Sequence, residues 1–96
     1  MKIVRDEKFT QALTGILVYI ARDSKSGARF FRNALQKTIG TLDTFPYKYR
    51  QSYYYNDPQI RDLIFKGYTI PYLIDEKRDV IVILDIFKWI EKKRKE

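Results

Sequence analysis

The sequence predicts a single α+β domain in which two helices pack against one face of a β-sheet. The first half of the chain has apolar residues three and four positions apart, which is the helical period. The second half, from Arg61 to Trp89, has three apolar runs joined by two short turns. Residues 1–96 are therefore expected to form one domain, with a short N-terminal strand, an antiparallel helical hairpin, and a three-stranded antiparallel meander that makes one sheet against the helices.

The N-terminal half accounts for the first strand and the two helices. Residues 2–5 suit an edge strand that leads into a helix. The first helix should place its apolar stripe on one face, at Phe9, Leu13, Ile16, Leu17 and Ile20. Turn and capping residues at 23–27 should end it, and a second stripe follows at Ala28, Phe31, Leu35, Ile39 and Leu42. A connection of about five residues makes the two helices antiparallel neighbours.

Phe45-Pro46 should end the second helix, because a residue before proline is pushed out of helical geometry. Residues 47–58 then hold five of the eight tyrosines and have neither helical nor strand periodicity, so we expect a loop. The side chains of Tyr53, Tyr54 and Tyr55 are expected to pack over one end of the core. The alternative is a platform on which nucleic-acid bases stack.

The C-terminal half provides the meander. Lys66-Gly67 suits a tight hairpin turn and residues 75–79 a looser one. The third run, residues 80–87, is apolar on both faces and should be the most buried strand. Pro71 cannot donate a hydrogen bond to a neighbouring strand, so the pairing should be broken locally there. The charged tail from Ile90 to Glu96 suits a solvated helix.

Composition restricts the chemistry. The longest apolar runs, residues 16–21 and 80–84, are too short to span a bilayer, and the charged N-terminus has no signal-peptide core. We therefore expect a soluble, cytoplasmic protein. The chain has no cysteine and no histidine, so no metal site is expected and any acid–base chemistry would rest on other side chains. A net charge of +7 favours nucleic acid or an acidic protein as partner.

Four segments together carry a family resemblance. They are the apolar helical pattern from Ile16 to Pro46 and three strand motifs, Arg61-x-Leu63, Gly67-Tyr68-x-Ile70-x-Tyr72 and Ile81-x-Ile83-Leu84. In this order and spacing the sequence resembles the RelE/ParE superfamily of type II toxin-antitoxin toxins, and its long helical hairpin is more similar to ParE. The resemblance implies a toxin that inhibits bacterial growth and is neutralised by a cognate acidic antitoxin protein. It implies no cofactor and no small-molecule substrate.

The superfamily contains two mechanisms. RelE-like members are similar to ribonucleases that cut messenger RNA in the ribosome, whereas ParE-like members bind DNA gyrase and have no accepted catalytic residues. A ribonuclease needs cations near the phosphate and a group that moves a proton, and the candidates for these roles are Arg61, Lys88 and Tyr72. The residues expected to bind a target, by either mechanism, are Arg50, Tyr54, Lys66 and Trp89.

Departures from the family pattern favour the gyrase mechanism. Thr69 and Lys88-Trp89 stand where many members carry arginine, or histidine and arginine. Lysine holds a phosphate without the bidentate grip of arginine. Arg61 could instead pair with a carboxylate on the sheet, and the buried-strand residue Asp85 should have Arg50 or Arg61 as its partner. A non-toxic RNA-binding module remains the alternative from another functional class.

Overall fold

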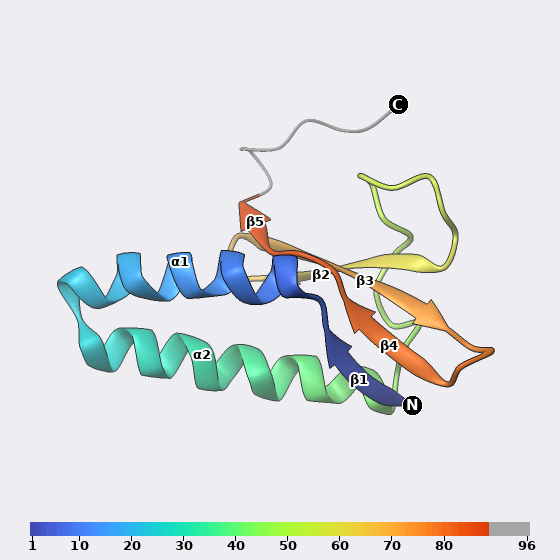
Figure 1. The fold of residues 1–96 in the computed structure, drawn as a ribbon, viewed down its shortest axis with the longest axis horizontal. Coiled ribbons are helices and arrows are strands. Elements are labelled where there is room, and N and C mark those ends of the chain that lie inside the picture. Colours follow the sequence, from blue (N-terminus) through green and yellow to red (C-terminus); the bar gives the residue numbers. More distant parts are fainter. Residues whose placement is uncertain (89–96) are drawn as a thin grey trace.

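The structure is a computed structural model that describes residues 1–88. Trp89 and the tail for which we predicted a solvated helix lie outside the described residues. Within residues 1–88, a helical hairpin packs against one face of a mixed β-sheet (Figure 1). The predicted α+β class is therefore confirmed.

The helical hairpin has a tighter connection than we predicted. Its helices are α1 (Glu7–Asp23) and α2 (Lys25–Gly40), and a 3-10 turn, η1 (Thr41–Asp43), follows α2. Only Ser24 separates the helices. Its N–H donates to the Ile20 carbonyl oxygen at 3.0 Å, and its hydroxyl oxygen accepts the Gly27 N–H at 2.9 Å. The prediction of a five-residue connection is wrong because one serine caps the end of α1 and the start of α2.

The sheet is mixed because its first strand pairs in parallel with its last long strand. The strands are β1 (Lys2–Arg5), β2 (Ile60–Phe65), β3 (Tyr68–Asp75), β4 (Val80–Ile83) and β5 (Phe87–Lys88). Their order is β1-β4-β3-β2, and β5 pairs with β3. The meander from β2 to β4 is antiparallel as predicted, whereas β1 runs parallel to β4 at the sheet edge. The helical hairpin lies between β1 and the meander in sequence, which supplies the long connection that a parallel pair requires.

The core lies between the helical hairpin and the inner face of the sheet. Its fully or nearly fully buried members include Phe9, Leu35, Ile39, Leu42, Leu63, Ile70, Tyr72, Ile74, Ile81 and Ile83. The most buried strand is β3 rather than the predicted third run. This difference follows from position, because β3 has β2 on one side and β4 and β5 on the other.

A β-bulge lies beside Pro71, where we predicted broken pairing. Tyr72 pairs with Ile83 in the β3–β4 ladder, but Thr69 pairs with Phe87 in the β3–β5 ladder, so the register shifts by one residue between them. Pro71 still accepts the Leu84 N–H at 2.9 Å but has no N–H to donate in return. The proline therefore divides the third apolar run into two strands, while its pairing with β2 on the other side continues.

The helical hairpin is longer than the sheet that it covers. Figure 1 shows the connected ends of α1 and α2 extending past the strands. No helix among residues 1–88 is both long and apolar enough to cross a membrane.

Candidate functional site

The loop between η1 and β2 extends the sheet beyond its β2 edge. Ser52 donates its N–H to the Ile60 carbonyl oxygen at 2.7 Å, and Asp62 donates its N–H to the Arg50 carbonyl oxygen at 3.1 Å. These bonds flank an isolated antiparallel bridge between Gln51 and Arg61. The loop thus occupies part of an edge that would otherwise expose unpaired backbone groups.

Three cation–aromatic pairs gather on this loop and the start of β2. We call these six residues the loop cluster: Tyr47, Lys48, Tyr49, Arg50, Tyr53 and Arg61. The Arg61 guanidinium carbon lies 5.0 Å from the Tyr47 ring centroid, and its Nη1 donates to the Tyr49 carbonyl oxygen at 3.1 Å. Its buried Nε has no hydrogen-bond partner among the described residues. Arg61 therefore binds the loop instead of a carboxylate.

Tyr72 lies beside Arg61 on the inner face and holds the start of the loop. It is fully buried, and its hydroxyl donates to the Pro46 carbonyl oxygen at 2.6 Å. Burial raises the pKa of Tyr72 to about 12, against the lowering effects of the Tyr49 backbone and the Arg61 charge. The neutral phenol is thus the form present at physiological pH, and it clamps the loop to β3.

Asp62 holds the loop from the opposite face of β2. Its Oδ2 accepts the Tyr53 N–H at 2.8 Å and lies 3.8 Å from Nη2 of Arg50. The carboxylate is fully buried, whereas the Arg50 side chain is 60% exposed and lies 5.6 Å from the Tyr53 ring centroid. The Arg50 guanidinium therefore remains largely exposed to solvent, while the buried Asp62 carboxylate holds the loop through the Tyr53 N–H.

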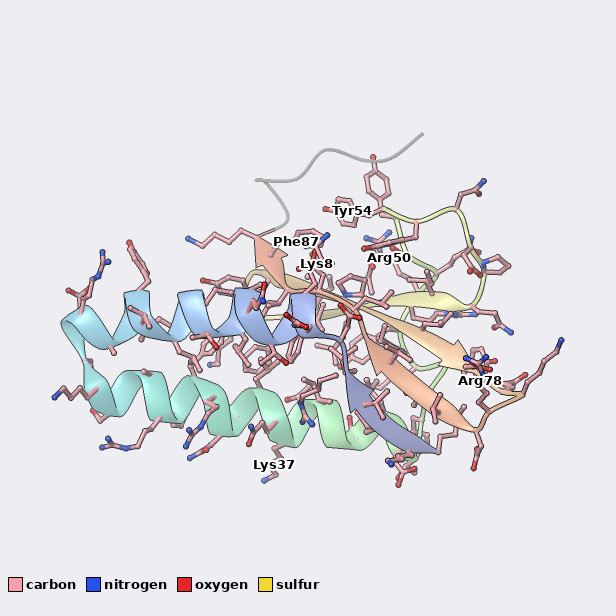
Figure 2. The ribbon with its side chains drawn as sticks, viewed as in Figure 1. Lys8, Lys37, Arg50, Tyr54, Arg78 and Phe87 are labelled. Atoms are coloured by element: carbon pink, nitrogen blue, oxygen red, sulfur yellow. The ribbon has the colours of Figure 1, made fainter. Side chains whose placement is uncertain are left out.

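Tyr54 packs inside the molecule. It is buried, and its ring meets Phe87 edge-on at 5.0 Å and Tyr53 at 5.4 Å (Figure 2). The packing role is thus the one observed for this tyrosine, and its burial leaves almost none of the ring for the target contact that the sequence also suggested. Tyr53 is 45% exposed and Tyr55 is half-buried, so the three rings do not form one flat platform.

A second group of cations and rings surrounds the tight turn between β2 and β3. We call it the turn cluster: Phe30, Phe65, Lys66, Tyr68 and Lys88. Lys66 Nζ lies 5.5 Å from the Phe30 centroid and 5.7 Å from the Phe65 centroid. Lys88 Nζ lies 6.0 Å from the Tyr68 centroid. Both ammonium groups belong to exposed residues, so each presents charge beside an aromatic surface.

The ion pair at Asp85 differs from our prediction. Lys8 Nζ, from α1, lies 3.4 Å from Asp85 Oδ2, while Arg50 pairs with Asp62. Asp85 also accepts the Ile86 N–H at 2.8 Å. Burial raises the pKa of the nearby Tyr55. The charge of Lys8 lowers that pKa, and the charge of Asp85 adds to the increase. No local sequence pattern could identify Lys8, because only the fold brings the start of α1 to the bulge.

The three residues proposed for ribonuclease chemistry do not converge. Arg61 pairs with Tyr72 across the β2–β3 ladder, whereas Lys88 pairs with Tyr68. Tyr68 and Tyr72 are four positions apart along β3, or about 13 Å at the rise of a strand. Trp89 lies outside the described residues. The described residues also contain no group of three or more potential metal ligands of the Asp, Glu, His or Cys type.

The fold and the two basic clusters define a small, basic α+β domain whose exposed cations suit an acidic macromolecular partner. A family model described as "ParE toxin of type II toxin-antitoxin system, parDE" matches residues 3–88. The chain therefore belongs to the ParE toxin family, which confirms the predicted resemblance.

A solved structure supports the fold assignment. The chain is similar to a chain of the "Chromosomal ParDE TA system from P. aeruginosa", with a TM-score of 0.73. The identity is 16%, and the match covers 92% of this chain and 95% of the other. At this identity the likeness shows a shared fold. No curated protein gives a significant match.

Proposed function

We propose that this chain arrests bacterial growth from within the cytoplasm by inhibiting DNA gyrase, and that a cognate acidic antitoxin neutralises it. Membership of the ParE family is the observation that carries the proposal. The target-binding surface comprises the exposed cations of the two clusters, chiefly Arg50 and Lys66, with Arg61 and Lys88 beside them. Trp89 follows Lys88 directly in sequence and is a further candidate.

The geometry supports a binding toxin over a ribonuclease. A ribonuclease needs its cation and its proton-transfer group around one phosphate. Tyr72 instead uses its hydroxyl to hold Pro46, and Lys88 belongs to the other cluster. Tyr54 and Tyr72 then support the surface by fixing the loop from inside.

The test begins with induced expression of the chain in bacteria, alone and together with the product of a small reading frame adjacent to its gene. We expect growth arrest that the neighbouring protein reverses, and inhibition of supercoiling when the purified chain is added to purified gyrase. Intact transcripts should accompany the arrest. Normal supercoiling at a large molar excess of the chain would exclude the gyrase target, and cleaved messenger RNA would favour the ribonuclease alternative.

Charge reversal separates the proposed surface from general basicity. Arg50→Glu combined with Lys66→Glu should raise the concentration needed for half-inhibition by about tenfold or more, since each charge at an interface contributes on the order of 1 kcal/mol. Arg78→Glu is the control, because Arg78 is 83% exposed, lies apart from Arg50 (Figure 2), and belongs to the β3–β4 turn, at the opposite end of β3 from Lys66. If both variants lose the same amount of inhibitory activity, Arg50 and Lys66 do not belong to the binding surface.

A further inference from the structure

The segment between η1 and the loop cluster carries exposed aromatic side chains around a pocket. Residues 44–48 line this pocket, which has a volume of about 590 Å³. Phe45 is 62% exposed and Tyr47 is 42% exposed, with Pro46 between them. The volume lies within the range of ligand-binding pockets, about 300–1,000 Å³. A single exposed apolar residue is ordinary, whereas neighbouring aromatic rings around a concave surface mark an interaction site.

The backbone of the pocket is held in place by the rest of the fold. Phe45 donates its N–H to the Thr41 carbonyl oxygen at 3.1 Å, and Lys48 donates its N–H to the Phe45 carbonyl oxygen at 3.2 Å. Between them, the Pro46 carbonyl oxygen accepts the hydroxyl of the buried Tyr72 at 2.6 Å. Because the pocket is already ordered, a partner that enters it meets a small entropic cost.

The Tyr47 ring forms a fixed wall of the pocket. The Arg61 guanidinium carbon lies 5.0 Å from the ring centroid, and the Tyr47 hydroxyl donates to Oε1 of Gln59 at 3.3 Å. Burial, and then a hydrogen bond to Glu76, raises the pKa of the Tyr47 phenol. Arg61 already covers a face of this ring, so the pocket suits an apolar side chain better than a stacked nucleic-acid base.

The free charge beside the pocket is positive. Lys48 lines the pocket, and Arg61 lies against its Tyr47 wall. Neither cation makes a salt bridge within residues 1–88. The adjacent acid Asp43 is already paired with the Met1 ammonium at 2.8 Å. A second copy of this chain would bring like charges together at a two-fold axis, whereas an acidic partner would neutralise them.

The pocket is continuous with the surface proposed to bind the target. Tyr47 and Lys48 belong both to the pocket and to the loop cluster. Arg50 follows two residues after Lys48, and both side chains are exposed. A protein segment with one apolar side chain in the pocket would therefore bring its neighbouring residues to these two cations.

We propose that this pocket binds a large apolar side chain of the gyrase target, from a segment whose adjacent carboxylates pair with Lys48 and Arg50. The inference rests on the proposed function and adds an apolar anchor to a surface so far described by its cations. A few well-packed anchors of this kind usually supply most of the binding energy at a protein interface, while the charges around them supply orientation.

The first experiment measures inhibition of purified gyrase by variants of the full chain. Phe45→Ala removes the more exposed aromatic ring of the pocket and should raise the concentration needed for half-inhibition by about tenfold or more. Phe45→Leu keeps an apolar wall and should stay within about threefold of the wild type. Tyr19→Ala is the matched control, because Tyr19 is 64% exposed and lies on α1, and its effect should be less than about threefold.

The second experiment tests the charge of the occupant. Lys48→Glu should raise the half-inhibition concentration by about tenfold, and this difference from the wild type should shrink between about 50 and 300 mM salt. Lys25→Glu is the control, because Lys25 is exposed and begins α2, whereas the pocket follows the far end of this 16-residue helix, about 24 Å away at the helical rise. Circular dichroism should show that all variants fold, since each substituted side chain is exposed.

Equal half-inhibition concentrations in Phe45→Ala and Tyr19→Ala would overturn the proposal and leave gyrase as the target. Binding of DNA by the chain alone that Phe45→Ala abolishes would assign the pocket to nucleic-acid bases instead. A wild-type dimer that Phe45→Ala dissociates would assign it to a second copy of the chain. Weaker neutralisation by the antitoxin, with unchanged inhibition of gyrase, would assign it to the antitoxin.

Growth arrest in cells separates this proposal from the proposed function. If the wild-type chain arrests growth but leaves gyrase active, the gyrase target fails. Relief of the arrest by Phe45→Ala and not by Tyr19→Ala would then still support the pocket as the anchor site for a target protein, and equal arrest by both variants would exclude it. If the wild-type chain neither arrests growth nor inhibits gyrase, both proposals fail.

Discussion

Replacing Tyr72 by phenylalanine tests the tyrosine clamp that fixes the loop cluster. The substitution preserves the buried ring and removes only the hydroxyl, which donates to the Pro46 carbonyl oxygen at 2.6 Å. Such a hydrogen bond contributes about 1 kcal/mol to the free energy of unfolding. In a domain of this size, that loss lowers the melting temperature at neutral pH by about 4 to 8 °C.

The pH dependence provides the sharper test. Because burial raises the pKa of Tyr72 from 10.0 to about 12, the folded state holds its phenolic proton more tightly than the unfolded state does. The resulting stabilisation is fully present below pH 10 and is lost as the pH rises toward 12. The loss amounts to roughly 2 to 3 kcal/mol, because each pKa unit corresponds to about 1.4 kcal/mol.

Tyr72→Phe removes this titration, so the wild type should be the more stable protein at neutral pH and the variant the more stable one at high pH. The variant should be less stable by about 1 kcal/mol at pH 7 and more stable than the wild type above about pH 11, with the curves crossing between. Urea unfolding followed by circular dichroism, at pH 7 to 11.5, measures both free energies.

Tyr19→Phe is the control for removing the hydroxyl group of an exposed tyrosine. Tyr19 is 64% exposed, so the loss of its hydroxyl should leave the free energy of unfolding unchanged within about 0.5 kcal/mol at pH 7. If the free energies of unfolding of the wild type and Tyr72→Phe differ by a constant amount from pH 8 to 11.5, burial does not raise the pKa of Tyr72. If Tyr72→Phe is as stable as the wild type at pH 7, the hydroxyl does not hold the loop.

Two further predictions concern the stability effects of the glycines at positions 67 and 15 and of the hydrogen bond between Asp62 and the loop. Gly67→Ala should destabilise the fold by about 1 kcal/mol because φ is +84° there, whereas Gly15→Ala in α1 should stabilise it by about 0.5 to 1 kcal/mol. Urea unfolding measures both changes in free energy, and changes of the same sign would contradict the prediction. Asp62→Ala should cost about 1 to 3 kcal/mol and speed amide exchange at Tyr53, which loses its acceptor. Asp75→Ala removes a surface ion pair and serves as the control, and it should change the free energy of unfolding by less than about 0.5 kcal/mol. Equal losses of stability in the two aspartate variants would show that the contact between Asp62 and the loop does not stabilise the fold.

Local sequence rules predicted elements whose causes are themselves local. The apolar stripes of α1 and α2 follow the helical period, and the Lys66-Gly67 turn follows from the demand for positive φ in a two-residue hairpin. The effect of Pro71 could also be predicted, because a residue without an N–H disrupts strand pairing wherever it lies. The length of the helical connection could not be predicted from the sequence, since Ser24 alone caps both helices where five residues were expected.

The sequence indicated which residue types could form a candidate site, but it did not indicate which of them contact one another. Arg50, Arg61, Lys66 and Lys88 all lie in the two clusters. Their partners depend on which segments meet. Arg61 stacks on Tyr47 because the loop folds back along β2. Asp85 pairs with Lys8 because α1 begins near the bulge.

By itself, the sequence determined the α+β class, the helical hairpin, the antiparallel meander and a positive surface, because periodicity, turn chemistry and net charge act over a few residues or over the whole composition. Only the tertiary structure decided that β1 joins in parallel, that Tyr72 serves as a buried clamp, and that the uncharged middle of α1 stays partly exposed. These features depend on contacts between distant segments and on how far the sheet extends beneath the helices, and no local pattern specifies either.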